Sequence, residues 1–316
     1  PSLVRLGASY RPTLDCRNRA VQEVFRLMAP RMVGAAAVQA MLWVNTLLAS
    51  RYEGAVYALT LGFMMMYMAQ AAIAQSAATA ALPVFSAQYA LGKLDDLRST
   101  LLGVLRAEIL LSLPATAGLI LLGEPIIRFL YERGEFTPRT TEMVAWALAW
   151  YATGLLFHSV LEVLVRVYYA MHDTKTPVLV GTTAMMLSIG LSVLFSHLFE
   201  QAGWMPHGGL ALAVSVSTAL ETGTLFVILH RKLPGLDSRL VGSLVAGGTG
   251  TLGMSLALLG WQQVIRSAPA AWVALGGVGL GASIYFLLLF FLKVPEARLV
   301  VDYFKRLVTR PGKPDA

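Results

Sequence analysis

The sequence predicts an all-α polytopic membrane protein with about eight transmembrane helices. Of its 316 residues, 56% are hydrophobic and only 14% are charged, and the mean hydropathy is +0.64. Soluble proteins carry about 25% charged residues, so this composition favours a membrane protein. The run from Gly54 to Gly92 contains no charged residue, and a helix needs only roughly 20 apolar residues to cross a bilayer.

Eight apolar segments follow one another between charged connectors. In order they are Met32–Ser50, Gly54 to about Ala77, Thr100–Gly123, Met143–Tyr169, Val178–Phe199, Gly208–His230, Leu240–Gln263 and Ala271–Leu292. The second segment continues to Tyr89, and we expect its helix to end near Pro83, because proline lacks a backbone N–H and kinks or stops a helix. Two connectors are predicted between spans, a charged loop over Glu124–Glu142 and a tight turn over Met171–Pro177.

Polar side chains recur on one face of the second segment. At about 100° per residue, Thr60, Tyr67 and Gln75 share a face. Polar groups in hydrocarbon cost free energy unless they meet partners or water, so this face is predicted to look inward. A wet substrate cavity and simple hydrogen bonds between helices both fit the pattern. Gln39, inside the first span, is a further candidate for contact with a substrate.

Ionisable residues within the spans are candidates for coupling transport to an ion. Glu221 lies near the middle of the sixth span, which indicates either a functional carboxyl or a protonated structural one. His158, Glu162 and Arg166 stand four residues apart on one face of the fourth span. Here a solvated ion-pair ladder is favoured over a proton relay. Glu108, in the first turns of the third span, is expected at the membrane interface.

The sequence carries no motif of an enzyme, a metal centre or a nucleic-acid site. It lacks a Gly-rich phosphate loop, an HExxH motif and a nucleophile elbow, and Cys16 is its only cysteine. The formal net charge is +7. The basic residues behind it lie between apolar runs, as is typical of residues that flank a membrane. Basic residues gather in the connectors on the side of both termini. We therefore expect a multi-pass protein of the inner (cytoplasmic) membrane with both termini cytoplasmic and no cofactor.

Several short strings occur in the order and spacing of a known family. They are Asn45-Thr-Leu-Leu-Ala-Ser50, Leu82-Pro-Val-Phe-Ser86, Gly134-Glu-Phe-Thr137 and, most specific of all, Tyr168-Tyr-Ala-Met-His-Asp-Thr-Lys-Thr-Pro-Val178. On these strings the chain resembles the MurJ/MviN lipid II flippases of bacterial cell-wall synthesis. The resemblance implies a two-lobed fold similar to exporters of the MATE type, of which this chain would be the second half.

The resemblance also predicts how the chain is divided. Residues 1–28 would form a basic cytoplasmic or interfacial lead-in that ends in a surface-lying turn of helix. Residues 29–235 would form a six-helix MATE-like lobe, residues 236–292 two additional transmembrane helices, and residues 293–316 a basic cytoplasmic tail. Because the chain begins with Pro1 and resembles a second half, we expect an N-terminal half of the same protein as its partner.

Two departures from the family pattern bear on cargo and coupling. After Tyr57-Ala58 the family usually continues with Asp-Arg, an arginine held to contact the anionic substrate, whereas this chain has Leu59 and Thr60. Many relatives place an acidic residue of a cation site where Asn45 stands, and a neutral amide is a weaker ligand for a hard cation. Arg31, at the start of the first span, is a candidate partner for phosphate, although a membrane-flanking anchor fits it as well.

Three functions are consistent with these observations. The leading hypothesis is the flipping of a lipid-linked peptidoglycan precursor, lipid II, or of another anionic lipid, by two lobes that alternate around a polar cavity. A cation- or proton-coupled MATE-like exporter of small amphipathic molecules could instead use Glu221. A non-transporting membrane scaffold with a degenerate cargo site would tolerate Thr60. The last two spans are rich in glycine, so they could form a groove for a polyprenyl tail or simply pack closely.

Overall fold

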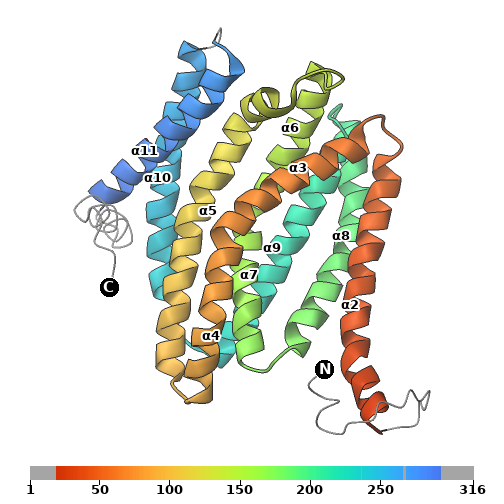
Figure 1. Cartoon of the computed structure of the whole chain (residues 1–316), viewed down its shortest axis with the longest axis vertical. Coiled ribbons are helices and arrows are strands. Elements are labelled where there is room, and N and C mark those ends of the chain that lie inside the picture. The colour runs from red at the N-terminus through yellow and green to blue at the C-terminus, as the bar shows by residue number, and fades with distance from the viewer. Residues whose placement is uncertain (1–18, 236, 266–267, 293–316) are drawn as a thin grey trace, which may run out of the picture.

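The structure, a computed structural model, describes residues 19–235, 237–265 and 268–292, and for residues 19–31, 33 and 237–239 it describes the backbone alone. Every regular element in these ranges is helical (Figure 1). The elements are α2 (Arg19–Ala49), α3 (Ala55–Gln70), the π-helical turn η1 (Ala71–Gln75), α4 (Ser76–Ala90), α5 (Leu94–Tyr131), α6 (Pro138–Ala152), α7 (Leu155–Ala170), α8 (Lys175–Gln201), α9 (His207–Lys232), α10 (Asp237–Val264), the π-helical turn η2 (Trp272–Gly276) and α11 (Gly277–Phe291).

The predicted spans are all found as helices. Within the described ranges, 6 helices are long and apolar enough to cross a membrane, and the bent pair α6 and α7 makes 7 if it counts as one span. The remaining segment is α2, whose apolar part is the shorter stretch Gly34–Ala49. The expectation of an all-α polytopic membrane protein is confirmed.

The second span does not end near Pro83, so that prediction is wrong. The helix continues through α3, η1 and α4 from Ala55 to Ala90, with Pro83 inside α4. A proline inside a helix removes one backbone hydrogen bond. Around it, however, Ala78, Ala81 and Phe85 are buried against neighbouring helices. Burial of these side chains stabilises the helix enough to carry it past the proline.

The prediction of a charged loop over Glu124–Glu142 is also wrong in its bounds. Helix α5 begins before the predicted Thr100 and runs on to Tyr131, and α6 begins at Pro138. The helix continues because its charges stand four residues apart: Arg128 pairs with Glu124 at 2.7 Å and with Glu132 at 3.4 Å. Such i,i+4 pairs stabilise a helix beyond its apolar part.

The fourth predicted span is one segment broken near its middle. Helices α6 and α7 meet at an angle of 48° across Thr153 and Gly154. Gly154 lies against α9, where a Cβ atom would come within 2.9 Å of the Ser215 Cα. The Ser215 hydroxyl donates to the carbonyl of Trp150 at 2.8 Å. The break is therefore fixed by a close approach of α9 to a glycine.

The lead-in predicted over residues 1–28 falls partly within the described residues. Residues 19–28 form the first turns of α2, and their backbone is continuous with the span. Their position at the membrane surface stays a prediction. The rest of the lead-in and the predicted tail over 293–316 lie outside the described residues.

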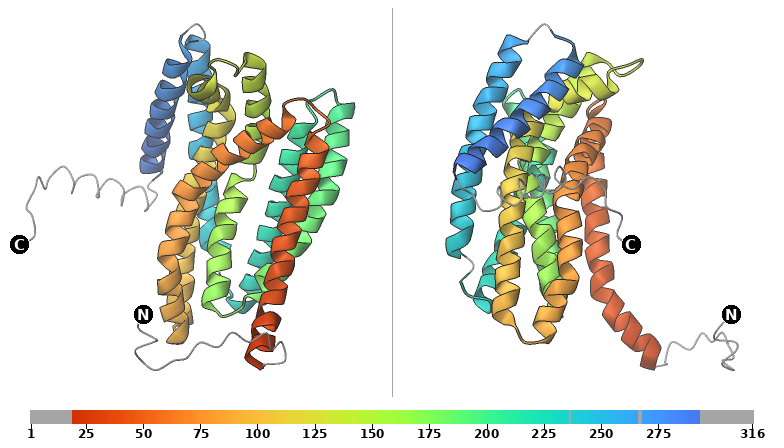
Figure 2. Two further views of the ribbon diagram at one scale, coloured as in Figure 1. Left: turned by 45° about the vertical axis from the view of Figure 1, so that its right-hand side comes forward. Right: turned by 60° about the vertical axis from the view of Figure 1, so that its left-hand side comes forward.

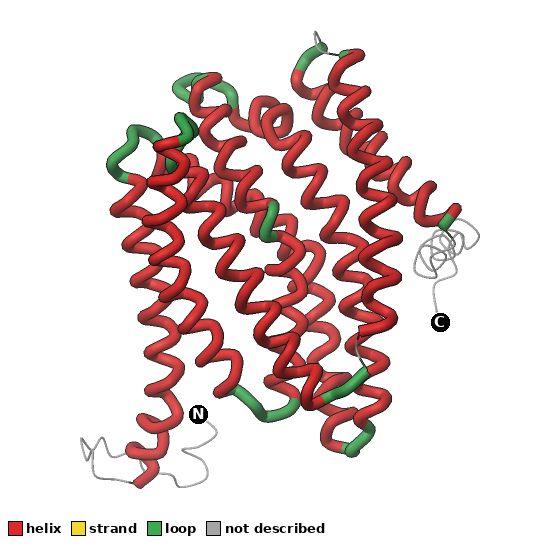
Figure 3. The backbone as a smooth tube through the Cα atoms, turned by 180° about the vertical axis from the view of Figure 1, so that it is seen from behind, coloured by secondary structure: helices red, strands yellow, loops and turns green. Residues whose placement is uncertain are grey.

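The helices run up and down between two ends of the bundle. Helices α10 and α11 lie at one edge against α5, and α2 and α8 lie at the opposite edge (Figure 2). The turns after α4, α7 and α9 lie at one end, which we call the basic end, and those after α2, α5 and α8 lie at the other, the loop end (Figure 3). Near the basic end, the buried Tyr168 hydroxyl of α7 donates to the carbonyl of Leu225 in α9 at 2.8 Å.

Candidate functional site

A cavity of about 330 Å³ lies between α2 and α3. Three of the predicted site residues line it: Asn45 from α2, and Thr60 and Tyr67 from α3. The other lining residues are mostly apolar, and they are Met41, Leu42, Thr46, Ala49, Val56, Leu59, Phe63, Met64, Tyr151 and Val214. Thr60 and Tyr67 therefore border a cavity, whereas their contact with a substrate stays a prediction.

The wall of this cavity on α3 is largely aromatic. Thr60 donates its hydroxyl to the carbonyl of Val56 at 2.8 Å, a bond within its own helix that leaves the side chain exposed. The Tyr67 ring is stacked on that of Phe63 with 6.2 Å between centroids, and Phe63 meets the edge of Tyr151 of α6 at 5.3 Å. The lining set of this cavity contains no charged side chain.

Two predicted substrate contacts, Gln39 and Gln75, lie elsewhere. Gln39 is exposed on α2, but it does not line the α2–α3 cavity. Gln75 is exposed in η1, two turns beyond Tyr67, and also lies outside the cavity lining. The side chain of Arg31 is outside the described atoms. The structure thus brings Thr60 and Tyr67 together with Asn45, and leaves Gln39 and Gln75 apart from them.

Glu221 lies between α8 and α9, away from the α2–α3 cavity. A Cβ atom on Gly181 of α8 would come within 2.9 Å of Glu221 Oε1, so the glycine makes room for the carboxyl group. Thr218, one turn earlier on α9, has its hydroxyl 3.4 Å from His158 Nε2 on α7. Glu221 therefore packs α9 against α8, and His158 packs α7 against α9.

The ion pair expected on α7 is present, but histidine does not join it. Arg166 Nη2 lies 2.6 Å from Glu162 Oε1, and each side chain is about one fifth exposed. Sequence reasoning was wrong about Glu108, which is 1% exposed instead of interfacial. Because α5 begins at Leu94, Glu108 stands about four turns inside the helix. Its Oε2 has no hydrogen-bond partner in the described part of the chain.

A second cavity, an apolar groove of about 290 Å³, runs between α5, α10 and α11 and reaches α3 at Ala69. Its remaining lining residues are Leu111, Pro114, Ala115, Gly118, Leu119, Leu122, Ile126, Met254, Leu258, Gly277, Val278, Gly281, Ala282, Tyr285 and Phe286. The only polar atom of its side chains, the Tyr285 hydroxyl, donates to the carbonyl of Leu110. The groove is therefore suited to a hydrocarbon chain.

The glycines of α10 and α11 lie where helices approach closely. A Cβ atom on Gly250 would meet the Tyr285 ring at 3.0 Å, and one on Gly253 would meet Leu288 at 2.5 Å. On α11, Gly277 lies against Leu122 of α5 in the same way. Glycine thus permits the close packing of α10 on α11 and of α11 on α5.

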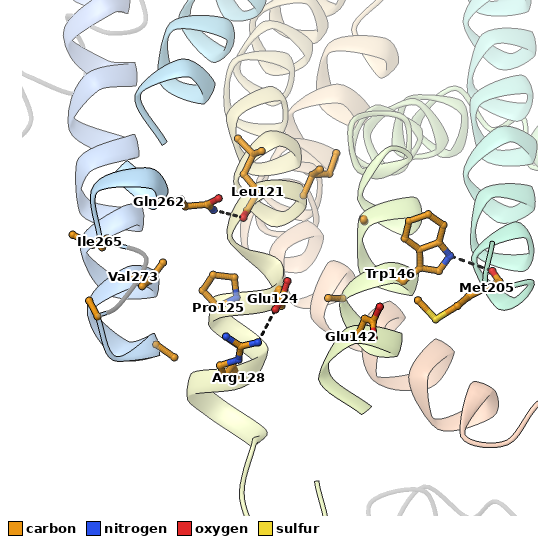
Figure 4. Close-up of a pocket in the computed structure, with 15 residues that line it drawn as sticks. Leu121, Glu124, Pro125, Arg128, Glu142, Trp146, Met205, Gln262, Ile265 and Val273 are labelled. Atoms are coloured by element: carbon orange, nitrogen blue, oxygen red, sulfur yellow. Dashed lines mark hydrogen bonds and ion pairs between the residues drawn. The ribbon is translucent and has the colours of Figure 1, made fainter. Parts of the chain in front are cut away.

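A third cavity, of about 610 Å³, opens at the loop end between α5, α6 and α10 (Figure 4). Four of its five polar side chains are already engaged, and the fifth is that of Glu142. Arg128 holds Glu124 at 2.7 Å, and Gln262 donates to the carbonyl of Leu121 at 2.6 Å. Across the cavity, the Trp146 indole donates to the carbonyl of Met205 at 3.1 Å. These contacts tie α5 to α10 and α6 to the α8–α9 turn.

Comparison with known proteins identifies the family. The family model described as lipid II flippase MurJ matches residues 1–275. The chain belongs to the lipid II flippase MurJ family. A probable lipid II flippase MurJ of Vibrio cholerae serotype O1 is 30% identical over 310 residues, which are 93% of this chain and 56% of that protein. The corresponding protein of Rickettsia prowazekii is 28% identical over 206 residues, 65% of this chain and 39% of its own length. The chain thus spans about half the length of the curated relatives that it matches.

Solved structures agree on the fold. A lipid II flippase MurJ in an inward closed conformation superposes with a TM-score of 0.73 at 21% identity, over 98% of this chain and 59% of that one. An outward-facing multidrug resistance MATE family transporter gives a TM-score of 0.54 at 14% identity, over 84% of this chain and 64% of that one. At these identities the likeness shows the fold alone, which is a MurJ-like bundle similar to MATE transporters.

The sequence string most specific to the MurJ family, Tyr168–Val178, forms a tight turn between α7 and α8. Asp173, in the turn after α7, accepts from the backbone N–H and the hydroxyl of Thr176 at 3.1 and 2.7 Å. Its other partner is Lys232 at the end of α9, at 2.6 Å. His172 before it adopts a φ of 58°, a left-handed conformation that tightens the turn. The string therefore fixes the α7–α8 turn to α9.

The cation site that the MurJ resemblance implies at Asn45 does not fit the residues present. Asn45 is uncharged, and its side-chain oxygen accepts a 2.8 Å hydrogen bond from the Ser192 hydroxyl of α8. Both side chains are buried. Ser188, one turn earlier on α8, is also neutral. Sequence reasoning found Asn45 but missed Ser192, because the two residues are 147 positions apart and no periodic pattern links them.

Proposed function

We propose that the protein to which this chain belongs flips lipid II across the cytoplasmic membrane, and that this chain is its second lobe with two additional helices. Membership of the MurJ family supports the proposal, as does the coverage of about half of each relative. The first lobe would then be supplied by the rest of the same protein. The function is transport, and no chemical reaction is assigned to the chain.

The observation that carries the proposal is that α3 borders two cavities, of which one includes the polar side chains of Asn45, Thr60 and Tyr67 and the other is almost wholly apolar. Thr60 and Tyr67 line the α2–α3 cavity, and Ala69, less than one turn further, lines the apolar groove of α5, α10 and α11. A lipid-linked sugar has a polar head and a long hydrocarbon tail. We propose that the head occupies the cavity while the tail stays in the groove, and that rocking of the two lobes changes the side from which the head is reached.

We propose a topology in which the basic end of the bundle is cytoplasmic. Among the described side chains, those of the basic end include five cations against three aspartates: Lys93, Arg98, Lys175, Arg231 and Lys232 against Asp95, Asp96 and Asp173. Those of the loop end include four arginines against six glutamates: Arg51, Arg128, Arg133 and Arg139 against Glu53, Glu124, Glu132, Glu135, Glu142 and Glu200. The positive-inside rule counts lysine and arginine. The five cations of the basic end against four at the loop end, together with the basic residues in the sequence of 1–28 and 293–316, support both termini in the cytoplasm.

The exporter hypothesis receives less support from the geometry. It needs an acidic group at the substrate cavity to meet an organic cation. Glu221 lies between α8 and α9, and Glu162 is already paired with Arg166, so neither lines the α2–α3 cavity. Coupling through Asn45, His158, Glu162, Arg166 or Glu221 stays a proposal, as does contact of Arg31, Gln39 and Gln75 with the cargo.

The test is reconstitution of the complete protein into liposomes that contain fluorescent lipid II. We expect protein-dependent exposure of lipid II on the opposite leaflet, and none from residues 1–316 alone, because one lobe cannot enclose a cavity that lies between two. Export of small cations without flipping of lipid II would favour the exporter. A complete protein that folds and moves neither would favour the scaffold.

A further inference from the structure

A fourth cavity, of about 590 Å³, opens at the loop end between three turns of the bundle. The α2–α3 turn, the start of α6 and the α8–α9 turn each supply part of its wall. The lining residues are Arg51, Tyr52, Glu53, Gly54, Thr137, Arg139, Thr140, Met143, Met205, Pro206 and His207. This cavity lies beside the α2–α3 cavity along the chain, because Ala49 at the end of α2 lines the one and Arg51 lines the other.

Two arginines of this cavity are not used by the fold. Arg51 and Arg139 come from different turns, both are exposed, and within the described residues neither forms an ion pair. Other arginines of the bundle are engaged, as Arg128 is with Glu124 and Arg166 is with Glu162. The lining of the cavity includes a single carboxylate, from Glu53, so its charge is positive on balance.

The frame that carries the two arginines is fixed. His207 Nε2 lies 3.0 Å from the carbonyl of Met143, which ties the α8–α9 turn to α6. At the start of α6, the Thr137 hydroxyl accepts from the Thr140 backbone N–H at 3.3 Å. Gly54 adopts a φ of 77°, which lets the α2–α3 turn close tightly. The fixed frame limits the backbone entropy that is lost when the two cations bind a ligand, and each exposed arginine side chain still loses rotamer freedom.

We propose that this cavity binds the diphosphate of a lipid-linked head group, with Arg51 and Arg139 as its cationic ligands. A guanidinium group donates two parallel hydrogen bonds to phosphate, and two such groups match a diphosphate. The α2–α3 cavity offers no cation to an anionic cargo, and Thr60 stands where the family resemblance expects an arginine. The assignment of the diphosphate to the cargo rests on the proposed function, whereas the phosphate chemistry of the cavity does not.

The experiment measures binding to the complete protein and to its variants Arg51→Gln and Arg139→Gln. The probes are inorganic pyrophosphate, a short-chain polyprenyl diphosphate, and phosphatidylglycerol in nanodiscs. Arg133→Gln is the matched control, because Arg133 lies in the α5–α6 turn and does not line the cavity. We expect each cavity variant to weaken binding of both diphosphates about tenfold, as loss of one charge-assisted pair does, while the control stays within about twofold.

Unchanged diphosphate affinity in both variants would overturn the proposal, and so would an equal loss in Arg133→Gln. A loss confined to phosphatidylglycerol would also overturn it, because a membrane phospholipid would then be the occupant. Flipping in liposomes is measured in parallel to separate this inference from the proposed function. Arginine-dependent pyrophosphate binding by a protein that does not flip lipid II would support the site and refute the flippase. Flipping of lipid II by a protein whose pyrophosphate binding does not depend on Arg51 or Arg139 would refute the site and support the flippase.

Discussion

The hydroxyl of Ser192 on α8 donates a 2.8 Å hydrogen bond to the side-chain oxygen of Asn45 on α2, and both side chains are buried. Helices α2 and α8 form the edge of the bundle opposite α10 and α11. The bond is therefore a specific polar contact between these two helices, at the margin of the α2–α3 cavity.

Removing either partner of this bond is expected to destabilise the bundle. Asn45→Ala and Ser192→Ala each leave one buried polar group unpaired, and interhelical hydrogen bonds in membrane proteins contribute about 0.6 kcal/mol on average and up to about 1.7. A double-mutant cycle on the free energy of unfolding in detergent measures the pair directly. A coupling energy of zero would mean that the two side chains do not act as a pair. Thr183→Ala on α8 is the control, because it removes only a bond within one helix.

The apolar segments of the sequence predicted the spans, but not where the helices end. The span from Thr100 became α5, which continues to Tyr131 because Arg128 pairs along the helix with two glutamates. The break between α6 and α7 depends on Ser215 of α9, a contact between distant parts of the chain. Hydropathy averages over many residues, so it cannot detect either effect.

For the candidate site, periodicity was informative only within one helix. Thr60 and Tyr67 are seven residues apart, which puts them on the same face, and both line one cavity. Pairs such as Asn45 with Ser192, or Arg51 with Arg139, come from different helices and turns. No single-sequence pattern relates such residues, since their proximity follows from the packing of whole helices.

Asp173 is predicted to stabilise the fold at neutral pH and to lose this effect in acid. Burial alone raises the pKa of Asp173, but hydrogen bonds from Lys232 and Thr176 outweigh it and hold the pKa at about 2. A carboxyl with a lowered pKa contributes stability above its unfolded value of about 3.9, and the contribution is lost as the pH falls toward 2. Asp173→Asn should therefore lower the melting temperature at pH 7 but not at pH 2.

The control for this prediction is Asp95→Asn. Asp95 pairs with Arg98 at 3.5 Å, but its side chain is 94% exposed, so solvent screens the pair. We expect this variant to have the same melting temperature as the wild type at both pH 7 and pH 2. An Asp173→Asn protein whose melting temperature stays below that of the wild type by the same amount at pH 7 and pH 2 would contradict the role of ionised Asp173.

The proposed topology predicts which turns are reached from outside the cell. Thr174→Cys in the α7–α8 turn and Glu135→Cys in the α5–α6 turn replace exposed residues at opposite ends of the bundle. In a Cys16→Ser background, an impermeant thiol reagent added to intact cells should label position 135 alone, and position 174 only after permeabilisation. Labelling of position 174 in intact cells would reverse the orientation.

A cation added to the α2–α3 cavity is expected to strengthen binding of an anionic head group. Thr60 is exposed and lines the cavity, so the side chain in Thr60→Arg can remain solvated. In contact with lipid the same arginine would cost about 2.5–3.5 kcal/mol. We predict a normal folded yield and tighter binding of lipid II. Met68→Arg, on the same helix but outside the cavity lining, should not tighten binding. A Thr60→Arg protein that does not fold would show that Thr60 faces lipid.

Filling the apolar groove is expected to weaken binding of a lipid-linked cargo through its tail. Ala282 of α11 lines the groove, whereas its neighbour Ser283 does not, and both are exposed. Ala282→Trp puts an indole into a space of about 290 Å³, so a hydrocarbon chain would lose contact area that is worth about 25 cal/mol per Å². Ser283→Trp adds the same bulk to the same helix outside the groove.

The measurement compares two ligands in the complete protein, a long polyprenyl-linked head group and the same head group on a short chain. If the groove holds the tail, Ala282→Trp should weaken binding of the long-chain ligand and leave the short-chain ligand unaffected, because only the long chain reaches α11. Ser283→Trp should bind both as the wild type does. Equal weakening of both ligands by Ala282→Trp would mean that the variant disturbs the head-group site, and unchanged long-chain binding would remove the tail from this groove.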